Sequence, residues 1–302
     1  MCRPDETTVA GPRGPVLPNC YISDAIAPEP LNLKRLLPAG APATAAKIVA
    51  GFGLDALAAS GSSSRPYVML NMVSTADGHA TLDGRSGPLS GPADRALFHA
   101  LRLAVDAVMA GAATVRVERY GRIVPDASRR QTRIARGLGE EPLACIVSGR
   151  LALEGDIPLL AEPAARVVVL TPSSASLPAS AAQVDYIRAE RDGQLDLSAA
   201  LAELRARFGV RTLLCEGGPH LNAQLLAAGV VDELFLSLSP LLAGGDLDRN
   251  PAQPEALRIL AGPSFSPPIA LELRGVLEHD SGLFLRYSVR HSEETGTASA
   301  GS

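Results

Sequence analysis

The chain has 302 residues, of which 46% are hydrophobic, enough for the core of one large domain or two small ones. Its formal net charge of -4 at pH 7 and pI of about 5.8 provide no global positive field, which argues against nucleic-acid and membrane-surface partners. No apolar run approaches the roughly 20 residues that span a bilayer, and the N-terminus lacks a signal-peptide core, so we expect a cytoplasmic protein.

The two ends of the chain differ from its middle. Residues 1–24 and 292–302 are rich in Pro, Gly or small polar residues without periodicity and are predicted to be disordered tails. Residues 25–64 are expected to be an N-terminal extension, weakly helical from Leu31 to Ala59 and ending in a serine-rich linker. The main domain is therefore expected to span residues 65–291.

Strands and helices alternate from residue 65 onwards. Apolar runs predict strands at 67–73, 106–110, 143–147, 166–170, 211–215 and 233–239. Helices are predicted after Ser90, after Gly111, from Asp196 to Gly209 and after Gly218. Residues 269–278 and 283–289 indicate an antiparallel hairpin. This order predicts an α/β sandwich with a mostly parallel mixed sheet and a C-terminal hairpin.

Three junctions between a strand and the following loop carry the chemical signal: Ser74-Thr-Ala-Asp-Gly78, Gly111-Ala-Ala-Thr114 and Glu216-Gly-Gly218. Ligands of open α/β sheets bind beyond the carboxyl ends of strands, so these loops should line one cleft. Glycines there permit tight turns and close approach to a ligand, and free N–H groups at a helix start attract phosphate. Taken alone, the Glu216 segment is more typical of an ordinary strand-turn-helix corner than of a ligand site.

Some charged residues have both a structural and a functional interpretation. Asp77 fits an Asp-Gly turn as well as an active-site acid. Arg102, on one helix face with His99, is ordinarily a surface residue. Glu216 ends an apolar strand, where a carboxylate is costly unless it meets a partner or a ligand. A basic run is expected to be a solvated face and consists of Arg129, Arg130, Arg133 and Arg136.

The cysteines and histidines indicate no metal site. The four cysteines lie far apart without a Cys-x-x-Cys pair, which argues against a zinc site or a disulfide framework. The five histidines show no metal-ligand spacing either. A zinc deaminase needs a His-x-Glu element followed by Pro-Cys-x-x-Cys, and this combination is also absent from the sequence. We therefore expect no metal.

Five motifs occur in one order along the chain: Arg65-Pro-Tyr-Val through Ser74-Thr-Ala-Asp-Gly78, Leu89-Ser-Gly-Pro-Ala-Asp-Arg95, His99-Ala-Leu-Arg102, Asp106-Ala-Val-Met-Ala-Gly-Ala-Ala-Thr-Val115, and Glu216-Gly-Gly-Pro-His-Leu221 through Val231-Asp-Glu-Leu234. In them the chain resembles the reductase domain of the riboflavin-biosynthesis deaminase-reductases. This resemblance implies a dihydrofolate-reductase-like three-layer sandwich and NADPH as cofactor. It also implies reduction of the ribosyl group of 5-amino-6-(5-phosphoribosylamino)uracil, or its diamino-pyrimidinone analogue, to ribityl.

The resemblance also implies roles for individual residues. Asp77 and Glu216 would be catalytic, by orienting the pyrimidine. The substrate would contact Asn71, Ser86, Arg102 and Glu216. The cofactor would contact Gly111, Ala112, Thr114, Glu118, Ser148, Gly217, Gly218, Pro219, His220 and Leu221. Arg150 is our own candidate for the cofactor's 2′-phosphate, because a guanidinium pairs well with phosphate.

Departures from the family pattern leave the substrate open. Asn71 stands where most of the family has a lysine, and it can hydrogen-bond but offers no cation. Pro88 replaces a tryptophan, and residues 119–125 replace the usual Asp-Pro-x-Leu-Thr-x-Arg stretch. Two alternatives therefore remain: an NADPH-dependent reductase of a pteridine such as dihydrofolate, and a non-catalytic nucleotide-binding protein. The resemblance and the apolar segment from Leu234 to Leu238 predict a homodimer formed by pairing of sheets.

Overall fold

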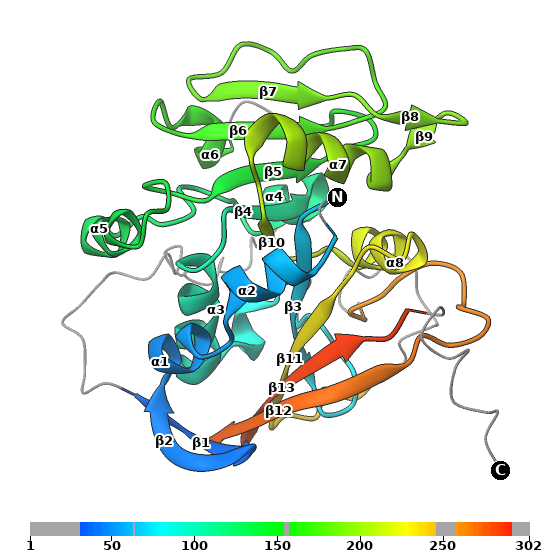
Figure 1. Cartoon of the computed structure of the whole chain (residues 1–302). Helices are drawn as coiled ribbons and strands as arrows, with labels where there is room; N and C mark the ends of the chain where they lie inside the picture. Colours follow the sequence, from blue (N-terminus) through cyan, green and yellow to red (C-terminus); the bar gives the residue numbers. More distant parts are fainter. Residues whose placement is uncertain (1–30, 63, 154–156, 246–257, 292–302) are drawn as a thin grey trace, which may run out of the picture. The chain divides into compact units, whose positions relative to one another are not determined.

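The computed structural model describes residues 31–62, 64–153, 157–245 and 258–291, and both predicted tails lie outside them. Within the described part, an 11-stranded sheet carries helices on both faces (Figure 1). Its strand order is β2-β1-β12-β13-β11-β3-β10-β4-β5-β6-β7. The strands from β11 to β7 in this order pair in parallel, whereas β13, β12, β1 and β2 pair antiparallel. The expected α/β fold with a mostly parallel mixed sheet and a C-terminal hairpin is confirmed.

The strands have the following bounds: β1 Asn32–Leu37, β2 Ala39–Thr44, β3 Tyr67–Thr75, β4 Ala107–Gly111, β5 Leu143–Val147, β6 Arg166–Leu170, β7 Gln183–Ile187, β10 Thr212–Cys215, β11 Glu233–Ser239, β12 Leu271–His279 and β13 Gly282–Val289. A separate two-stranded sheet pairs β8 Glu190–Arg191 with β9 Gln194–Leu195. The predicted strands all occur. Central strands such as β6 and β10 are apolar runs that the sheet buries, whereas β12 has no buried residue and is held by pairing with β1 and β13.

The helices have the following bounds: α1 Ala45–Ala50, α2 Leu54–Ser60, α3 Pro92–Arg102, α4 Ala112–Val117, α5 Ala127–Ala135, α6 Pro158–Ala161, α7 Leu197–Phe208 and α8 Pro219–Ala227, with a 3-10 turn at Gly87–Leu89. The predicted ends of α7 hold in detail. The Asp196 carboxylate accepts a hydrogen bond from the Ala199 N–H at 3.0 Å, and Gly209 ends the helix at φ +67°.

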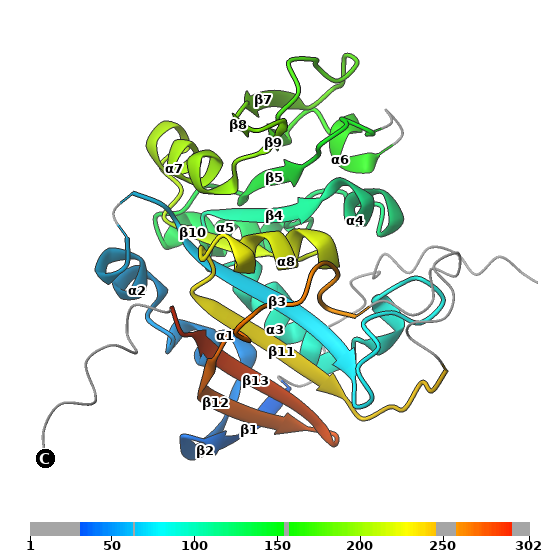
Figure 2. The same cartoon turned by 90° about the vertical axis from the view of Figure 1, so that its right-hand side faces the viewer.

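The sheet separates two apolar cores. Helices α1, α3, α4 and α6 pack with Met69 and Leu214 on one face, and α7 and α8 pack with Leu70 and Cys215 on the other. Figure 2 shows α3 and α8 on opposite faces of β3 and β11. Because side chains alternate along a strand, neighbouring residues of β3 and β10 face different cores. Residues on the Met69 face therefore point toward α3.

The described residues between 31 and 64 differ from the sequence-based expectation. The expected helical character occurs at α1 and α2, but β1 and β2 precede these helices as strands of the main sheet. Strand β1 pairs antiparallel with β12, and Leu33 is fully buried. Alanine-rich sequence favours helix locally, but pairing with β12 and burial decide the conformation here. The boundary at residue 65 is therefore wrong for residues 31–62, which belong to the main sheet and core.

The strand expected to mediate dimerisation has no free edge. β11, which contains Leu234 to Leu238, pairs with β3 on one side and with β13 on the other. A second copy cannot add to it by sheet pairing, because its backbone hydrogen bonds are already made within the chain. The homodimer stays a prediction, without support from this strand.

Arg133 is not on a solvated face, contrary to the expectation for the basic run. It is 1% exposed, and its guanidinium donates hydrogen bonds to the carbonyls of Arg102 at 2.9 Å, Val105 at 2.8 Å and Gly139 at 3.0 Å. Two of these carbonyls belong to the end of α3 and the turn after it, where backbone acceptors lack intrahelical donors. Arg133 therefore fixes α5 to the end of α3.

We expect Arg133→Gln to lower the free energy of unfolding by about 2–4 kcal/mol, because buried carbonyls lose charge-assisted hydrogen bonds. Chemical denaturation would measure the change. The matched control is Arg136→Gln, three residues further along, whose side chain is exposed. Equal stability of the two variants would contradict the anchoring role of Arg133.

Candidate active site

Strand β10 ends opposite the middle of β3, and Glu216 is the first residue after it. Strand β10 runs parallel to β3, and its last residue, Cys215, lies opposite Leu70. Glu216 is therefore level with Asn71, and its backbone N–H donates to the Met109 carbonyl of β4 at 2.8 Å. Leu70 and Cys215 belong to the core on the α8 side of the sheet. Because side chains alternate along a strand, Asn71 and Glu216, one position later, point to the other side, toward α3. The carboxyl end of β10 thus brings two of the predicted site residues to one place.

The Glu216 carboxylate forms a buried ion pair with Arg102. The two carboxylate oxygens accept from Nε and Nη2 of Arg102 at 2.7 Å each, and one of them also accepts from the Tyr120 hydroxyl at 2.6 Å. The third guanidinium nitrogen donates to the Ile123 carbonyl at 3.1 Å. The side chains of Arg102 and Glu216 are 12% and 3% exposed. Every nitrogen of this guanidinium therefore has an acceptor within the protein.

The electrostatics of the group keep Arg102 charged and Tyr120 neutral. Burial alone would lower the pKa of Arg102, but the adjacent Glu216 carboxylate raises it above its usual value. Burial, together with the same carboxylate, raises the pKa of Tyr120. The Arg102 guanidinium also lies over the Phe98 ring, 4.1 Å from its centroid. The Arg102–Glu216 ion pair is therefore held in a fixed orientation, with the Phe98 ring packed against the guanidinium.

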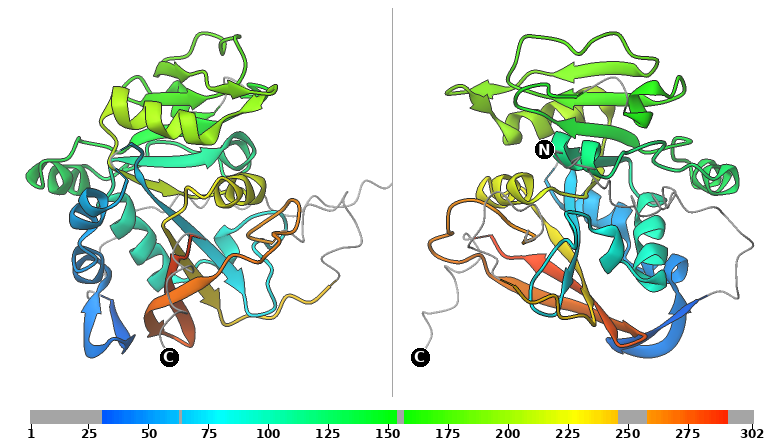
Figure 3. Two further views of the ribbon diagram at one scale, coloured as in Figure 1. Left: turned by 45° about the vertical axis from the view of Figure 1, so that its right-hand side comes forward. Right: turned by 180° about the vertical axis from the view of Figure 1, so that it is seen from behind.

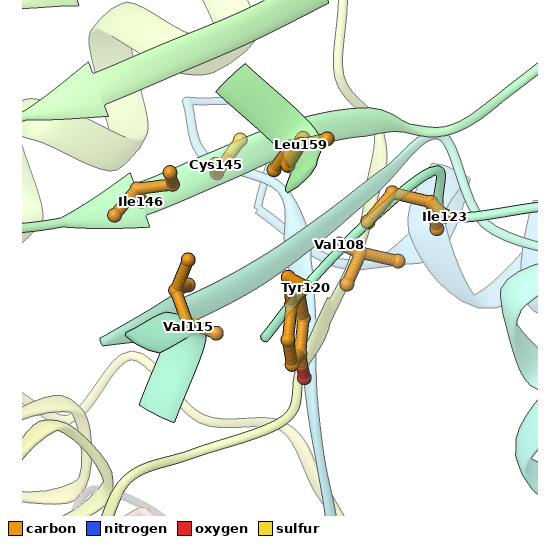
Figure 4. Close-up of a pocket in the computed structure, with 9 residues that line it drawn as sticks. Val108, Val115, Tyr120, Ile123, Cys145, Ile146 and Leu159 are labelled. Carbon is orange, nitrogen blue, oxygen red and sulfur yellow. The ribbon is translucent and has the colours of Figure 1, made fainter. Parts of the chain in front are cut away.

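Tyr120 was not singled out from the sequence. It lies in the stretch 119–125, whose sequence differs from the family pattern. That difference was the one feature of the sequence that pointed to this segment. Its ring also lines a small apolar hollow between β4, β5 and α4 (Figure 4). The volume of about 10 Å³ is room for roughly one water molecule, so the hollow is no substrate pocket.

Asn71 is half-buried beside this group. Its side chain has no hydrogen-bond partner among the residues that the structure describes, and its backbone pairs with Phe235 of β11. An amide in this position can donate to and accept from a ligand, but it brings no charge. The face next to Glu216 therefore lacks the cation that a lysine would provide.

Ser86 and Glu118, expected to contact the substrate and the cofactor respectively, lie against each other. Both the hydroxyl and the backbone N–H of Ser86 donate to one oxygen of the Glu118 carboxylate, at 2.9 and 3.1 Å. This contact joins the loop before α3 to the end of α4. The two expected ligand contacts thus meet at one point of the structure.

The Asp77 carboxylate connects two loops. It accepts hydrogen bonds from the backbone N–H groups of Gly244 at 2.7 Å and Ala243 at 3.2 Å, and from the Thr75 hydroxyl. The Thr75 hydroxyl first, and then the Gly244 N–H, lower the pKa of Asp77 well below its usual range. Asp77 is therefore ionised at neutral pH, which makes it a poor proton donor. Its contacts hold the loop after β11 against the loop after β3.

The glycine turns after β4 and β10 pack directly on each other. The Gly111 N–H donates to the Gly217 carbonyl at 2.7 Å. Gly217 has φ +94°, and a Cβ added at Gly218 would stand 2.9 Å from the Thr114 hydroxyl oxygen. Gly218 begins α8 without a side-chain cap, so the first N–H groups of that helix are not taken by a capping side chain. These features suit the close approach of a phosphate.

The remaining candidates for cofactor contact differ in exposure. Arg150 and His220 are exposed, and Arg150 has no side-chain partner among the described residues. Ser148 is 4% exposed at the end of β5. The Leu221 side chain is 5% exposed and packs in the core under α8, so a ligand can meet this residue only through its backbone. Ala112 and Pro219 complete the two turns.

No group of His, Cys, Asp or Glu in the described part of the chain is arranged to hold a metal ion. The helices described there are also too short or too polar to cross a membrane.

Comparison with known proteins identifies the family. Residues 66–285 match the family described as the RibD C-terminal domain. A curated relative, the 2,5-diamino-6-ribosylamino-4(3H)-pyrimidinone 5′-phosphate reductase of Methanothermobacter thermautotrophicus, is 28% identical over 230 residues, which cover 75% of this chain and 99% of the relative. The chain belongs to the RibD C-terminal domain family. It is a reductase domain of the riboflavin-biosynthesis type, as the sequence motifs predicted.

Solved structures of low sequence identity share the fold of this RibD C-terminal domain. A pyrimidine reductase-like protein from Corynebacterium diphtheriae has a TM-score of 0.64 at 24% identity, covering 83% of this chain and 100% of that protein. The Saccharomyces cerevisiae riboflavin biosynthesis reductase Rib7 has a TM-score of 0.57 at 16% identity, covering 81% of this chain and 98% of that protein. The RibD match begins at residue 66, so β1, β2, α1 and α2 precede the matched region while belonging to the same sheet and core.

Proposed function

We propose that this RibD C-terminal domain is a cytoplasmic, NADPH-dependent reductase that converts the ribosyl group of a phosphoribosylamino-pyrimidine to ribityl. The observation that carries the proposal is the buried Arg102–Glu216 pair standing beside uncapped glycine turns in a chain of this reductase family. The Methanothermobacter relative is named for a substrate of this class.

The residues present fit a dinucleotide cofactor. The Gly217–Gly218 turn and the start of α8 offer backbone N–H groups for its phosphates, and the Thr114 hydroxyl lies against the same turn. Arg150 is exposed and without a partner in the described chain, as a ligand for a 2′-phosphate requires. When bound, NADPH supplies a hydride, and the reduced carbon in the substrate is C1′ of the open ribosyl chain.

The protein's contribution to the reaction is orientation. Arg102 and Tyr120 occupy three acceptor positions of the Glu216 carboxylate and fix its orientation, and the remaining position would accept an N–H of the pyrimidine, with Asn71 offering a neutral donor and acceptor beside it. Asp77 acts through the loop at 243–244 that it fixes. Holding the donor and acceptor carbons in register accounts for most of the rate increase expected of such a site.

A second substrate class is supported by one observation. Asn71 leaves the face beside Glu216 without a second cation, and a neutral bicyclic pteridine does not need one. An acidic group facing a ring of this kind suits either heterocycle, so dihydrofolate is the matched comparison substrate.

The test is an assay of NADPH oxidation with the phosphoribosylamino-pyrimidine and with dihydrofolate. We expect turnover of the phosphoribosylamino-pyrimidine, and a kcat/KM at least about tenfold lower for dihydrofolate. The reverse preference would establish the pteridine alternative. Saturable NADPH binding without oxidation in the presence of either substrate would establish the non-catalytic alternative.

A further inference from the structure

The N-terminal segment of residues 31–62 packs on the side of the sheet that carries the proposed substrate site. Helix α1 lies against α3, the helix that ends at Arg102. Figure 3 shows the N-terminal helices, in blue, beside α3. Val49 of α1 and Leu101 of α3 belong to one buried core. A segment that precedes the family match at residue 66 therefore packs against the helix that carries the buried ion pair.

Three side chains form a row across neighbouring strands on this same face. Phe235 of β11 lies opposite Asn71 of β3 on one side and opposite Arg286 of β13 on the other. Directly paired residues of neighbouring strands point to the same face, so these side chains are neighbours. Phe235 is buried in the core on the α3 side, which places the whole row there. The position of the Phe235 ring therefore limits the positions open to Asn71.

Phe52 covers this row from the turn between α1 and α2. Its ring stacks on Phe235, with 5.4 Å between the centroids and 29° between the planes. The Arg286 guanidinium lies 4.2 Å from the centroid of the Phe52 ring. It also donates to the carboxylate of Glu233 at 2.9 and 2.6 Å. Aromatic stacking and a cation over a ring each favour one arrangement. Phe52 therefore fixes both neighbours that it contacts, Phe235 and Arg286.

The groups proposed to bind the cofactor lie away from Phe52. Helix α8, whose first turn is proposed to hold the cofactor phosphates, packs on the opposite face of the sheet, where Leu221 is buried together with α7 residues. Among the described residues, no hydrogen bond or ring contact joins Phe52 to α8 or to the turn at Gly217 and Gly218. A change at Phe52 should therefore affect the substrate side and leave the cofactor side intact.

We propose that Phe52 is a positioning residue of the active site and holds Asn71 in place for the substrate by way of Phe235. The identity of the substrate rests on the proposed function, whereas the packing of Phe52 on the row does not. Asn71 offers a neutral donor and acceptor, and an amide that is already aligned loses little conformational freedom when a ligand binds. A segment outside the matched family region thus contributes to substrate affinity.

The first test compares substitutions at Phe52 and Phe208 in the full chain. Phe208 is also half-buried and also lies under an arginine, Arg207, but it belongs to α7 on the other face. We expect Phe52→Ala to raise the KM for the pyrimidine substrate at least about tenfold, with kcat and NADPH affinity nearly unchanged. Phe208→Ala should change none of these values. An equal loss of substrate and NADPH affinity in Phe52→Ala would overturn the proposal.

A double-mutant cycle shows whether Phe52 acts through Asn71. If it does, the effects of Phe52→Ala and Asn71→Ala on kcat/KM overlap, and the double variant should be about as impaired as Asn71→Ala alone. Phe208→Ala combined with Asn71→Ala is the control for additivity. Full multiplication of the two separate effects in the Phe52 and Asn71 double variant would refute the proposal.

An NMR measurement without any ligand separates the positioning role from the proposed function. The side-chain amide signals of Asn71 are assigned with Asn71→Asp. We expect Phe52→Leu to shift them and Phe208→Leu to leave them in place, because only the first ring contacts the row. Leucine keeps most of the buried volume, so this measurement stands even where Phe52→Ala does not fold.

The NMR result has two informative outcomes. Unmoved Asn71 signals in Phe52→Leu would refute the positioning role, whichever substrate the enzyme reduces. Shifted signals in a protein that reduces neither the pyrimidine nor dihydrofolate would refute the proposed function and leave the packing role of Phe52 standing.

Discussion

Glu216→Gln is expected to lower the free energy of unfolding by about 3–5 kcal/mol and to abolish reductase activity. The glutamine keeps the shape of the side chain but removes the charge that balances Arg102, which is only 12% exposed. A buried guanidinium without a counter-ion is strongly destabilising, whereas the intact pair contributes little by itself. Denaturant unfolding and NADPH oxidation with the pyrimidine substrate measure the two effects.

A double variant separates stability from function. Replacing both partners by apolar residues, as Arg102→Met with Glu216→Leu, removes both buried charges and should recover most of the lost stability. Activity should stay absent, because the anionic edge at the substrate is gone. Tyr120→Phe removes only one hydrogen bond to Glu216 and should cost about 1–2 kcal/mol. An active Glu216→Gln enzyme would contradict the role proposed for this carboxylate.

Gly218→Ala is expected to weaken NADPH binding at least about tenfold and to lower the free energy of unfolding by about 1–3 kcal/mol. The added methyl group would stand 2.9 Å from the Thr114 hydroxyl oxygen, closer than a real Cβ contact permits. The backbone of Gly218, at φ -80°, suits alanine, so the effect comes from lack of space between the two turns. Fluorescence titration with NADPH and chemical denaturation test both parts.

Two further variants make the result for Gly218 specific. Gly91→Ala, where a Cβ meets nothing within 4 Å and φ is -77°, should leave stability nearly unchanged. Adding Thr114→Ala to Gly218→Ala removes the clashing oxygen and should restore stability. NADPH binding should remain weak in that double variant, because the Thr114 hydroxyl is itself a proposed ligand. Recovery of tight binding would instead show that only the clash had mattered.

Much of the fold could be predicted from the sequence because its signals are local. Strands such as β5 and β6 are continuous apolar runs that only a doubly covered sheet buries, and α7 lies between an Asp196 cap and a Gly209 stop. The family followed from motifs whose order and spacing are themselves properties of the sequence. Strands β1 and β2 were missed because residues 31–59 as a whole are alanine-rich and resemble helix, while the pairing of β1 with β12 is a contact between distant parts of the chain.

The sequence by itself determined which residue types stand at the ends of the parallel strands and which reductase family they indicate. Only the tertiary structure decided their partners. Glu216 and Arg102 are 114 residues apart and were expected to contact a substrate separately. They meet as a buried pair because Glu216, just after β10, points toward the face of the sheet on which α3 packs. Arg133 and Arg136 belong to one basic run, but burial gives the first to backbone carbonyls and leaves the second exposed. Partner choice depends on burial and distance, and neither can be read from local sequence when the partners lie far apart along the chain.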